Sequence, residues 1–226
     1  MNVIELKGVG KVFKDGPRPT VALRNISLQI KPGEMLAIMG PSGSGKSTLL
    51  NIVGLLDVSS SGKYYIDNGL IARQNDHYLA KVRREKIGFV FQSFNLLGRL
   101  TLAQNIELPM IYRQVRAKER RKRARELLAS VGLKGYEKYT PNQISQGQAQ
   151  RAAIARALAN QPSLILADEP TGNLDTKSSE VVMDIFKKLN KAGATLVIVT
   201  HNPEIAAYAH RTVVIRDGQI VRGAKK

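Results

Sequence analysis

Cysteine does not occur in the 226-residue sequence. Its absence excludes disulfide frameworks, zinc sites built on thiolates, and cysteine nucleophiles. No stretch approaches the roughly eighteen consecutive uncharged apolar residues of a membrane-spanning helix, so we expect the chain not to cross a membrane by itself. The opening residues Met1–Gly10 show neither the basic nor the apolar region of a secretory signal, and we expect no such signal.

Acidic residues are scarce. The chain has 18 Asp and Glu against 35 Lys and Arg, which gives a formal charge of +17. Such an excess indicates an anionic partner: nucleic acid, lipid headgroups or nucleotide phosphates. The densest run, Arg113–Arg125, holds eight basic residues and one acid, Glu119. We interpret it either as a solvated helix face or as a segment attracted to anionic headgroups of the cytoplasmic leaflet. No aromatic residues are interleaved with these cations, which disfavours nucleic acid.

The first part of the sequence is patterned as strands. Val3–Phe13 and Val21–Ile30 are strand-like runs separated by a turn-rich segment, Asp15–Pro19. The second run alternates apolar and polar residues, as a half-buried strand does. A short apolar strand over Met35–Met39 precedes a Gly- and Ser-rich loop, and the apolar run Thr48–Leu56 predicts a buried helix after that loop.

Residues 93–160 are patterned as helices. Thr101 and Gln104 have the spacing of a capping box at the start of the first helix. The second helix carries the basic run Arg113–Arg125 and an apolar face, and the third is expected over Ser145–Asn160. We therefore expect these residues to form a helical subdomain.

Strands and helices alternate again after this segment. The expected elements are two apolar strands, the helix between them, and a final hairpin that turns at Asp-Gly: Leu164–Ala167, Ser178–Lys191, Thr195–Val199, and Thr212–Ile215 with Gln219–Val221. This alternation predicts an α/β fold with a mostly parallel sheet. Residues 1–92 and 161–226 would form that core, which includes an N-terminal antiparallel β region, and residues 93–160 would be inserted into it.

The loop after Met39 matches the P-loop pattern G-x-x-x-x-G-K-[ST] between a strand and a helix. Glycines let backbone N–H groups approach phosphate oxygens, and the following helix adds its positive end. Lys46 would reach the β- and γ-phosphates, and the Ser47 hydroxyl would bind Mg²⁺. A plain Gly- and Ser-rich turn gives no reason for Lys-Ser at that offset. We expect a P-loop NTPase core of the RecA-like type, whose loop binds the nucleotide through Gly40, Pro41, Ser42, Gly43, Ser44, Gly45, Lys46, Ser47 and Thr48.

Two adjacent carboxylates follow the apolar strand Leu164–Ala167. Ligands of open α/β sheets bind at the carboxyl ends of the strands, so Asp168 and Glu169 would face the triphosphate. Asp168 would hold Mg²⁺ through water, and Glu169 would polarise an attacking water. A charged strand end that meets solvent is the alternative, but the P-loop in the same chain favours hydrolysis.

Six motifs follow one another along the chain: GPSGSGKST, IGFVFQ ending at Gln92, ISQGQ, the strand ending in DEP, NLD, and TLVIVT before His201. In this order they resemble the ATP-binding subunits of ABC transporters over essentially the whole chain. TGNLD and FQSFNLLGRLT are similar to the branch that serves macrolide export, lipoprotein release and antimicrobial-peptide resistance. The resemblance implies an ATPase at the cytoplasmic face of the membrane. It would use ATP and Mg²⁺, pair head to tail with a second copy around two ATP molecules, and power a separate integral membrane permease.

The resemblance also implies a role for each matching residue. Phe13 would stack on the adenine, Gln92 would sense Mg²⁺ and the lytic water, and His201 would hold the γ-phosphate during catalysis. A further set would contact the ATP bound by the opposite subunit or couple the two sites: Ser145, Gly147, Gln148 and Asp175.

The signature segment departs from the family's LSGGQ, because Ile144–Gln148 reads ISQGQ. Gln146 therefore occupies the first glycine position. If that position needs only helical geometry, Gln is tolerated; if it needs close backbone approach, the side chain weakens the ATP-bound dimer. Ser145 and Gln148 have capping-box spacing, which predicts a helix N-terminus with outward N–H groups. Ser145 could simply cap that helix.

Three classes of function are compatible with these motifs. The first is an ATPase that powers a transport permease, and the second is a soluble ABC-type ATPase that acts on DNA or ribosomes. The third is a regulatory ATPase that controls a permease-like partner in cell-wall division without transport. The chain holds one P-loop and one signature, with no heptad arms and no zinc cysteines, which disfavours the second class. The sequence does not separate the first from the third.

Overall fold

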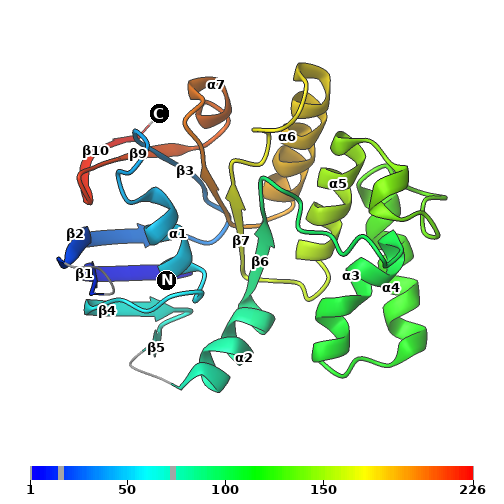
Figure 1. Ribbon diagram of the computed structural model, residues 1–226, viewed down its shortest axis with the longest axis horizontal. Helices are drawn as coiled ribbons and strands as arrows, with labels where there is room; N and C mark the ends of the chain where they lie inside the picture. The colour runs from blue at the N-terminus through cyan, green and yellow to red at the C-terminus, as the bar shows by residue number, and fades with distance from the viewer. Residues whose placement is uncertain (1, 15–17, 72–74, 226) are drawn as a thin grey trace.

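A six-stranded sheet forms the centre of the computed structural model, which describes residues 2–14, 18–71 and 75–225 (Figure 1). Its strand order is β10-β9-β3-β8-β7-β6; β10 runs antiparallel to β9, and the other pairs are parallel. The strands are β3 (Met35–Met39), β6 (Ile87–Val90), β7 (Leu164–Asp168), β8 (Leu196–Val199), β9 (Arg211–Arg216) and β10 (Gln219–Lys225). The mostly parallel sheet and the final hairpin are confirmed.

A four-stranded antiparallel sheet precedes it, in the order β2-β1-β4-β5. Its strands are β1 (Ile4–Phe13), β2 (Thr20–Ile30), β4 (Ser61–Ile66) and β5 (Gly69–Ile71). The alternation read in the second strand is confirmed, because Ile26, Leu28 and Ile30 are buried and the residues between them are exposed. The predicted turn Asp15–Pro19 lies partly outside the described residues. The short strands β4 and β5 were not predicted.

Alternation along the parallel strands builds two hydrophobic cores, one on each face of the sheet. Along β3, Leu36 and Ile38 pack into the cluster shared with α1 and the antiparallel sheet. Met35 and Ala37 point the other way, into the cluster shared with the later helices. Both faces are thus covered, which is why the parallel strands read as continuous apolar runs.

The helices are α1 (Lys46–Val53), α2 (Asp76–Lys86), α3 (Leu102–Tyr112), α4 (Ala117–Ser130), α5 (Gln146–Ala157), α6 (Thr176–Lys191) and α7 (Pro203–Ala206), with a 3₁₀ turn at Pro141–Gln143. Helices α3, α4 and α5 gather at one end of the molecule (Figure 1). Thr101 and Gln104 form the predicted capping box of α3. Helix α2 was not predicted.

The basic run does not lie on one helix, as the sequence had suggested. Arg113 is the C-cap of α3 and Arg116 is the N-cap of α4, because Gln114 between them has a left-handed φ of 57° that breaks the helical path. The predicted helix after the P-loop is also shorter than expected: α1 ends at Val53, and Leu55 again has a positive φ, 57°. None of the helices within the described ranges has both the length and the hydropathy needed to cross a bilayer.

Candidate functional site

The P-loop connects β3 to α1, and its glycines are required by their surroundings. Gly40 has a φ of 154° and Gly45 a φ of 103°. A Cβ at Gly40 would lie 2.2 Å from the carbonyl oxygen of Ile215, and one at Gly45 would lie 2.6 Å from that of Ala22. Backbone conformation and close approach to β9 and β2 therefore both exclude larger residues here.

Lys46 begins α1, and its side chain folds back over the P-loop. Its Nζ donates to the carbonyl oxygens of Gly40 and Pro41, each at 2.8 Å. Ser47 and Thr48 follow in the first turn of α1, where backbone N–H groups lack intrahelical acceptors. An ammonium group and a helix N-terminus thus lie together at the carboxyl end of β3, where an anion is favoured.

Glu169 directly follows β7 and has a left-handed φ of 43°. Its Oε1 accepts a hydrogen bond from the backbone N–H of His201 at 3.0 Å and lies 2.7 Å from the His201 Nδ1. Its Oε2 accepts from the Thr200 hydroxyl at 3.1 Å. The structure therefore joins the two predicted residues Glu169 and His201, and adds Thr200, which the sequence reasoning missed although it ends the apolar run before His201.

Asp168 ends β7, beside Glu169. Burial raises the pKa of the Asp168 carboxyl above its ordinary value, and the negative charge of Glu169 raises it further. The positive charge of Lys46 opposes both effects. Two adjacent carboxyl groups and the P-loop lysine therefore interact electrostatically at the end of β7.

Gln92 follows β6 and is held by a residue outside the predicted site. Its Nε2 donates to the Asn173 Oδ1 at 3.3 Å, and the Asn173 Nδ2 donates to the Gln92 carbonyl oxygen at 3.2 Å. The NLD motif contains Asn173, but no local pattern connects it to Gln92, 81 residues earlier.

Nine of the predicted site residues line one cavity of about 380 Å³, and His201 is not among them. Its lining consists of Thr20, Val21, Ala22, Ser42, Gly43, Gly45, Lys46, Ser47, Thr48, Gln92, Asp168, Glu169 and Val199. Gly40, Pro41 and Ser44 belong to the P-loop but not to this lining. Phe13 also lies outside it: its ring is partly exposed, 4.8 Å from the Lys11 Nζ, and its strand position pairs with Thr20 of the lining.

The signature residues lie elsewhere. Ser145, Gly147 and Gln148 line a separate hollow of about 370 Å³, together with residues of α6. The two linings share no residue. Within one chain, the predicted signature residues are therefore not brought to the P-loop.

The sequence matches a protein-family model described as "ABC transporter" over residues 23–172. The chain belongs to the ABC transporter family, as an ATP-binding subunit. It is 54% identical to the uncharacterised ABC transporter ATP-binding protein YvrO of Bacillus subtilis over 219 residues, 97% of this chain and 96% of that protein. It is 47% identical over 226 residues to the macrolide export ATP-binding/permease protein MacB of Mannheimia succiniciproducens, covering all of this chain and 35% of that protein.

Solved structures of ABC family members have the same fold as this chain. The dimeric cassette MJ0796 of Methanocaldococcus jannaschii matches with a TM-score of 0.90 and 50% identity, over 98% of each chain. A second structure of it, in a dimeric post-hydrolysis state bound to ADP and Pi, matches with a TM-score of 0.90 and 49% identity. The family, the fold and the ATPase class inferred from the sequence are confirmed. The macrolide exporters among the relatives favour transport over the regulatory alternative.

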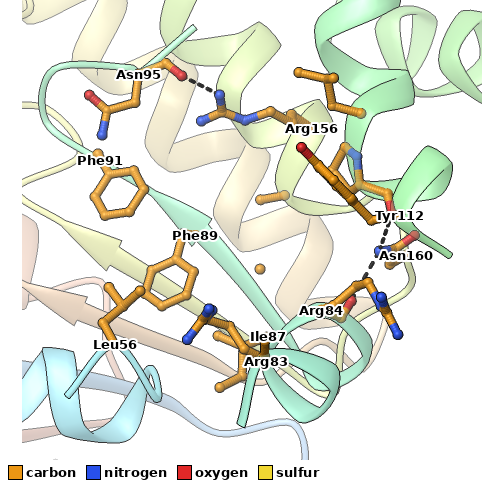
Figure 2. Close-up of a pocket in the computed structure, with 15 residues that line it drawn as sticks. Leu56, Arg83, Arg84, Ile87, Phe89, Phe91, Asn95, Tyr112, Arg156 and Asn160 are labelled. Atoms are coloured by element: carbon orange, nitrogen blue, oxygen red, sulfur yellow. Dashed lines mark hydrogen bonds between the residues drawn. The ribbon is translucent and has the colours of Figure 1, made fainter. Parts of the chain in front are cut away.

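A larger cavity of about 610 Å³ lies between α2, β6 and α3 of the cassette (Figure 2). Leu56, Phe89 and Tyr112 give it apolar walls, and the side chains of Arg83 and Arg84 lie at one side. We call this cavity the α2–α3 groove. No sequence pattern had indicated it, because its walls come from four separate stretches of chain.

The segment after β6 connects this groove to the phosphate cavity and to α5. Phe91 lines the groove, whereas the next residue, Gln92, lines the phosphate cavity. Arg156 of α5 donates to the carbonyl oxygens of Phe94, at 2.9 Å, and of Asn95 (Figure 2). Phe94 and Asn95 both have positive φ values, 60° and 50°, so the arginine holds a bend that is unfavourable for Phe94.

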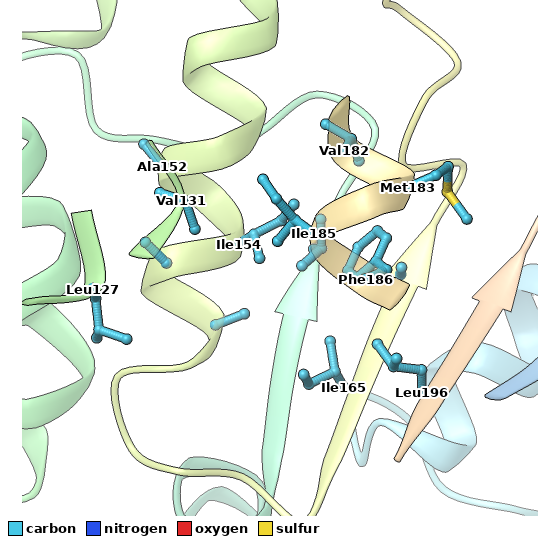
Figure 3. Packing of buried hydrophobic residues seen from close by; sticks show 14 of the residues in the cluster. Leu127, Val131, Ala152, Ile154, Ile165, Val182, Met183, Ile185, Phe186 and Leu196 are labelled. Carbon is cyan, nitrogen blue, oxygen red and sulfur yellow. The ribbon is translucent and has the colours of Figure 1, made fainter. Parts of the chain in front are cut away.

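Helix α5 packs against α6, and Ile154 and Ile185 lie together between them (Figure 3). The two helices approach each other closely at the start of α5, where a Cβ on Gly147 would lie 2.6 Å from the Oγ and 2.9 Å from the Cβ of Ser178. Ser178 is fixed by Asp175, which accepts from its backbone N–H at 2.9 Å and from its hydroxyl at 2.7 Å. These two hydrogen bonds lower the pKa of Asp175.

Gln146 begins α5, is exposed, and is not among the residues with positive φ. The close approach falls on Gly147 instead. Ser145 caps α5 through the predicted capping box: its Oγ accepts from the Gln148 N–H at 3.2 Å, and the Gln148 Oε1 accepts from the Ser145 N–H at 2.9 Å. Within one chain, the first glycine of the family signature is thus not needed for packing.

Proposed function

We propose that this chain hydrolyses ATP at the cytoplasmic face of a membrane and thereby drives a separate integral permease. The observation that carries the proposal is the single cavity lined by Lys46, Ser47, Gln92, Asp168 and Glu169. These side chains supply a cation that can bind phosphate, oxygen atoms that can bind a metal ion, and a carboxylate that can orient the attacking water. No other described part of the chain combines these three chemistries.

The phosphates of ATP would lie on the P-loop, against Lys46 and the N-terminus of α1. Mg²⁺ fits this cavity because the Ser47 hydroxyl, the Gln92 amide oxygen and the Asp168 carboxylate are the hard oxygen donors that it prefers. The described residues contain no cluster of three His, Cys, Asp or Glu, so water and phosphate oxygens would supply the remaining ligands. When bound, Mg²⁺ would neutralise phosphate charge.

Glu169 would orient the attacking water as general base, since its carboxylate is already positioned by His201 and Thr200. The His201 imidazole, 75% exposed at its side chain, would turn toward the γ-phosphate when ATP fills the cavity. The exposed ring of Phe13 would stack on the adenine, since the strand position that it pairs with, Thr20, lines the same cavity.

The site would be completed by a second copy of the chain. Ser145, Gly147 and Gln148, at the N-terminus of α5, line a hollow that shares no residue with the ATP cavity of their own chain, so they would meet the ATP of another subunit. Asp175 holds the α5–α6 contact through Ser178 and would couple the two sites. The dimeric form of the similar cassette MJ0796 supports the pairing of two subunits, which would be arranged head to tail. The signature would be carried by a helical subdomain of residues 93–160.

The permease would dock in the α2–α3 groove. Two apolar residues of the groove wall are exposed, Leu56 at 47% and Tyr112 at 68%. Exposed apolar side chains around a groove favour the docking of an apolar segment of the permease. Movement of that permease segment would displace Phe91, which lines the groove, and thereby Gln92, the next residue in the chain. By analogy with the MacB relatives, the transported substrate would be a macrolide, and the motif resemblance adds lipoproteins and antimicrobial peptides as candidate classes.

Two substitutions test the chemistry. Lys46→Ala should abolish ATP binding, and Glu169→Gln should keep ATP binding while blocking turnover, measured by fluorescent-nucleotide binding and phosphate release. Lys63→Ala is the matched control, because Lys63 is an exposed lysine of β4 outside the cavity. Hydrolysis at the wild-type rate by the Glu169→Gln protein would refute the role assigned to Glu169.

A further inference from the structure

We propose that the connection between α3 and α4, together with the exposed cations of α4, binds the anionic headgroups of a phospholipid bilayer. We call residues 111–125 the basic tip. The α2–α3 groove would bind the permease, whereas the basic tip would bind the lipid around the permease.

The first observation is unbalanced charge. Of the eight cations in the basic tip, Arg120 pairs with Glu107 at 3.3 Å and Lys122 lies 3.9 Å from Glu126. The other six have no acidic partner at ion-pair distance among the described residues: Arg113, Arg116, Lys118, Arg121, Arg123 and Arg125. A solvated helix face normally mixes charges of both signs, whereas these cations act together on an anionic surface.

The second observation is an exposed apolar pair beside those cations. Ile111 is 45% exposed and Tyr112 is 68% exposed, both in the last turn of α3. The left-handed turn at Gln114 follows immediately, so the pair lies where the chain reverses. Tyrosine is favoured at membrane interfaces because its ring is apolar and its hydroxyl is polar. Basic residues around an apolar anchor are the composition of surfaces that lie on anionic lipid.

The third observation is position. Tyr112 forms part of the wall of the α2–α3 groove, and Arg83 and Arg84 line the same groove (Figure 2). Helix α2 and the α3–α4 connection both lie along the lower side of the view in Figure 1. In this step the inference rests on the proposed function, because a permease seated in the groove places this side of the molecule against the bilayer.

The experiment is co-sedimentation of the full chain with vesicles, of phosphatidylcholine alone or of phosphatidylcholine containing phosphatidylglycerol. The test variant carries Arg116→Glu, Arg121→Glu and Arg125→Glu. The control carries Arg24→Glu, Lys31→Glu and Lys63→Glu, which are exposed positions on or next to the antiparallel sheet. Both variants replace three cations by three anions, so both change the formal charge from +17 to +11.

We expect wild type to bind only the phosphatidylglycerol vesicles, and less at higher salt. Each basic residue near such a surface contributes on the order of fivefold in partitioning, so the test variant should bind at least about a hundredfold more weakly. The control should bind within a few-fold of wild type. Ile111→Ser with Tyr112→Ser should remove the binding that persists at high salt.

Several results would overturn the inference. One is equal binding to both vesicle types, and another is unchanged phosphatidylglycerol binding by the test variant. If the test and control variants lost vesicle binding equally, binding would depend on the net charge of the protein and not on the basic tip. Loss of duplex DNA binding with lipid binding intact would assign the basic tip to nucleic acid. ATP hydrolysis by the same samples reports separately on the proposed function, since no reversed residue lines the ATP cavity.

Discussion

Gly147→Ala tests the packing that positions the signature helix. The new Cβ would lie 2.6 Å from the Ser178 Oγ and 2.9 Å from the Ser178 Cβ, well inside van der Waals contact. Ser178 cannot simply rotate away, because its hydroxyl donates to Asp175 at 2.7 Å. Either α5 moves off α6, or that hydrogen bond breaks.

The magnitude follows from three contributions. In a helix without the clash, Gly→Ala would stabilise the protein by up to about 1 kcal/mol. Overpacking costs about 1–3 kcal/mol, and loss of the Ser178–Asp175 hydrogen bond about 1 kcal/mol. We therefore expect Gly147→Ala to lower the free energy of unfolding by about 1–3 kcal/mol.

The effect of Gly147→Ala on the free energy of unfolding should change sign when Ser178 is first replaced by glycine. Ser178→Gly removes both close atoms and leaves the Ser178 Cα at 3.9 Å, an ordinary contact. In that background Gly147→Ala should be neutral or stabilising by up to about 1 kcal/mol. Urea unfolding of the four proteins of this cycle measures the difference as shifts in midpoint. A stabilising Gly147→Ala in the wild-type background would refute the packing argument.

Two further predictions concern the ATP cavity. Asn173→Ala should lower the rate of ATP turnover by up to about tenfold, which corresponds to the loss of one hydrogen bond. In a protein that already carries Gln92→Ala, the same substitution should have no further effect. Equal effects in both backgrounds would mean that Asn173 does not act through Gln92. The pKa of Asp168 is raised in the folded state, so its contribution lowers stability as pH rises above its ordinary value of 3.8. Asp168→Asn should therefore raise the urea midpoint more at pH 7 than at pH 4 in Mg²⁺-free buffer, and a lower midpoint at pH 7 would contradict this.

The sequence predicted the elements that carry strong local signals. The P-loop, the strand before Asp168 and the caps at Thr101 and Ser145 depend on neighbouring residues, and the structure contains them. The motif order also identified the family. Helix α2 and the strands β4 and β5 were missed because they are short or weakly apolar, and their stability comes from tertiary packing.

Long-range contacts were not predictable from local patterns. The pairing of Asn173 with Gln92 joins residues 81 positions apart, and the α2–α3 groove takes its walls from several segments. The break in the basic run depends on one left-handed residue, Gln114, whose type is not diagnostic of that conformation. The sequence also left open the effect of Gln146, which the structure places exposed at the start of α5.

Light scattering on purified Glu169→Gln protein, with and without ATP, tests the central claim that two chains complete each other's ATP sites. The account predicts that ATP doubles the mass, that Gln146→Gly leaves this unchanged, and that Ser145→Glu prevents it by placing a negative charge opposite the γ-phosphate. A protein that binds ATP but stays monomeric, with or without Gln146→Gly, would contradict the account. So would an ATP-dependent dimer that tolerates Ser145→Glu.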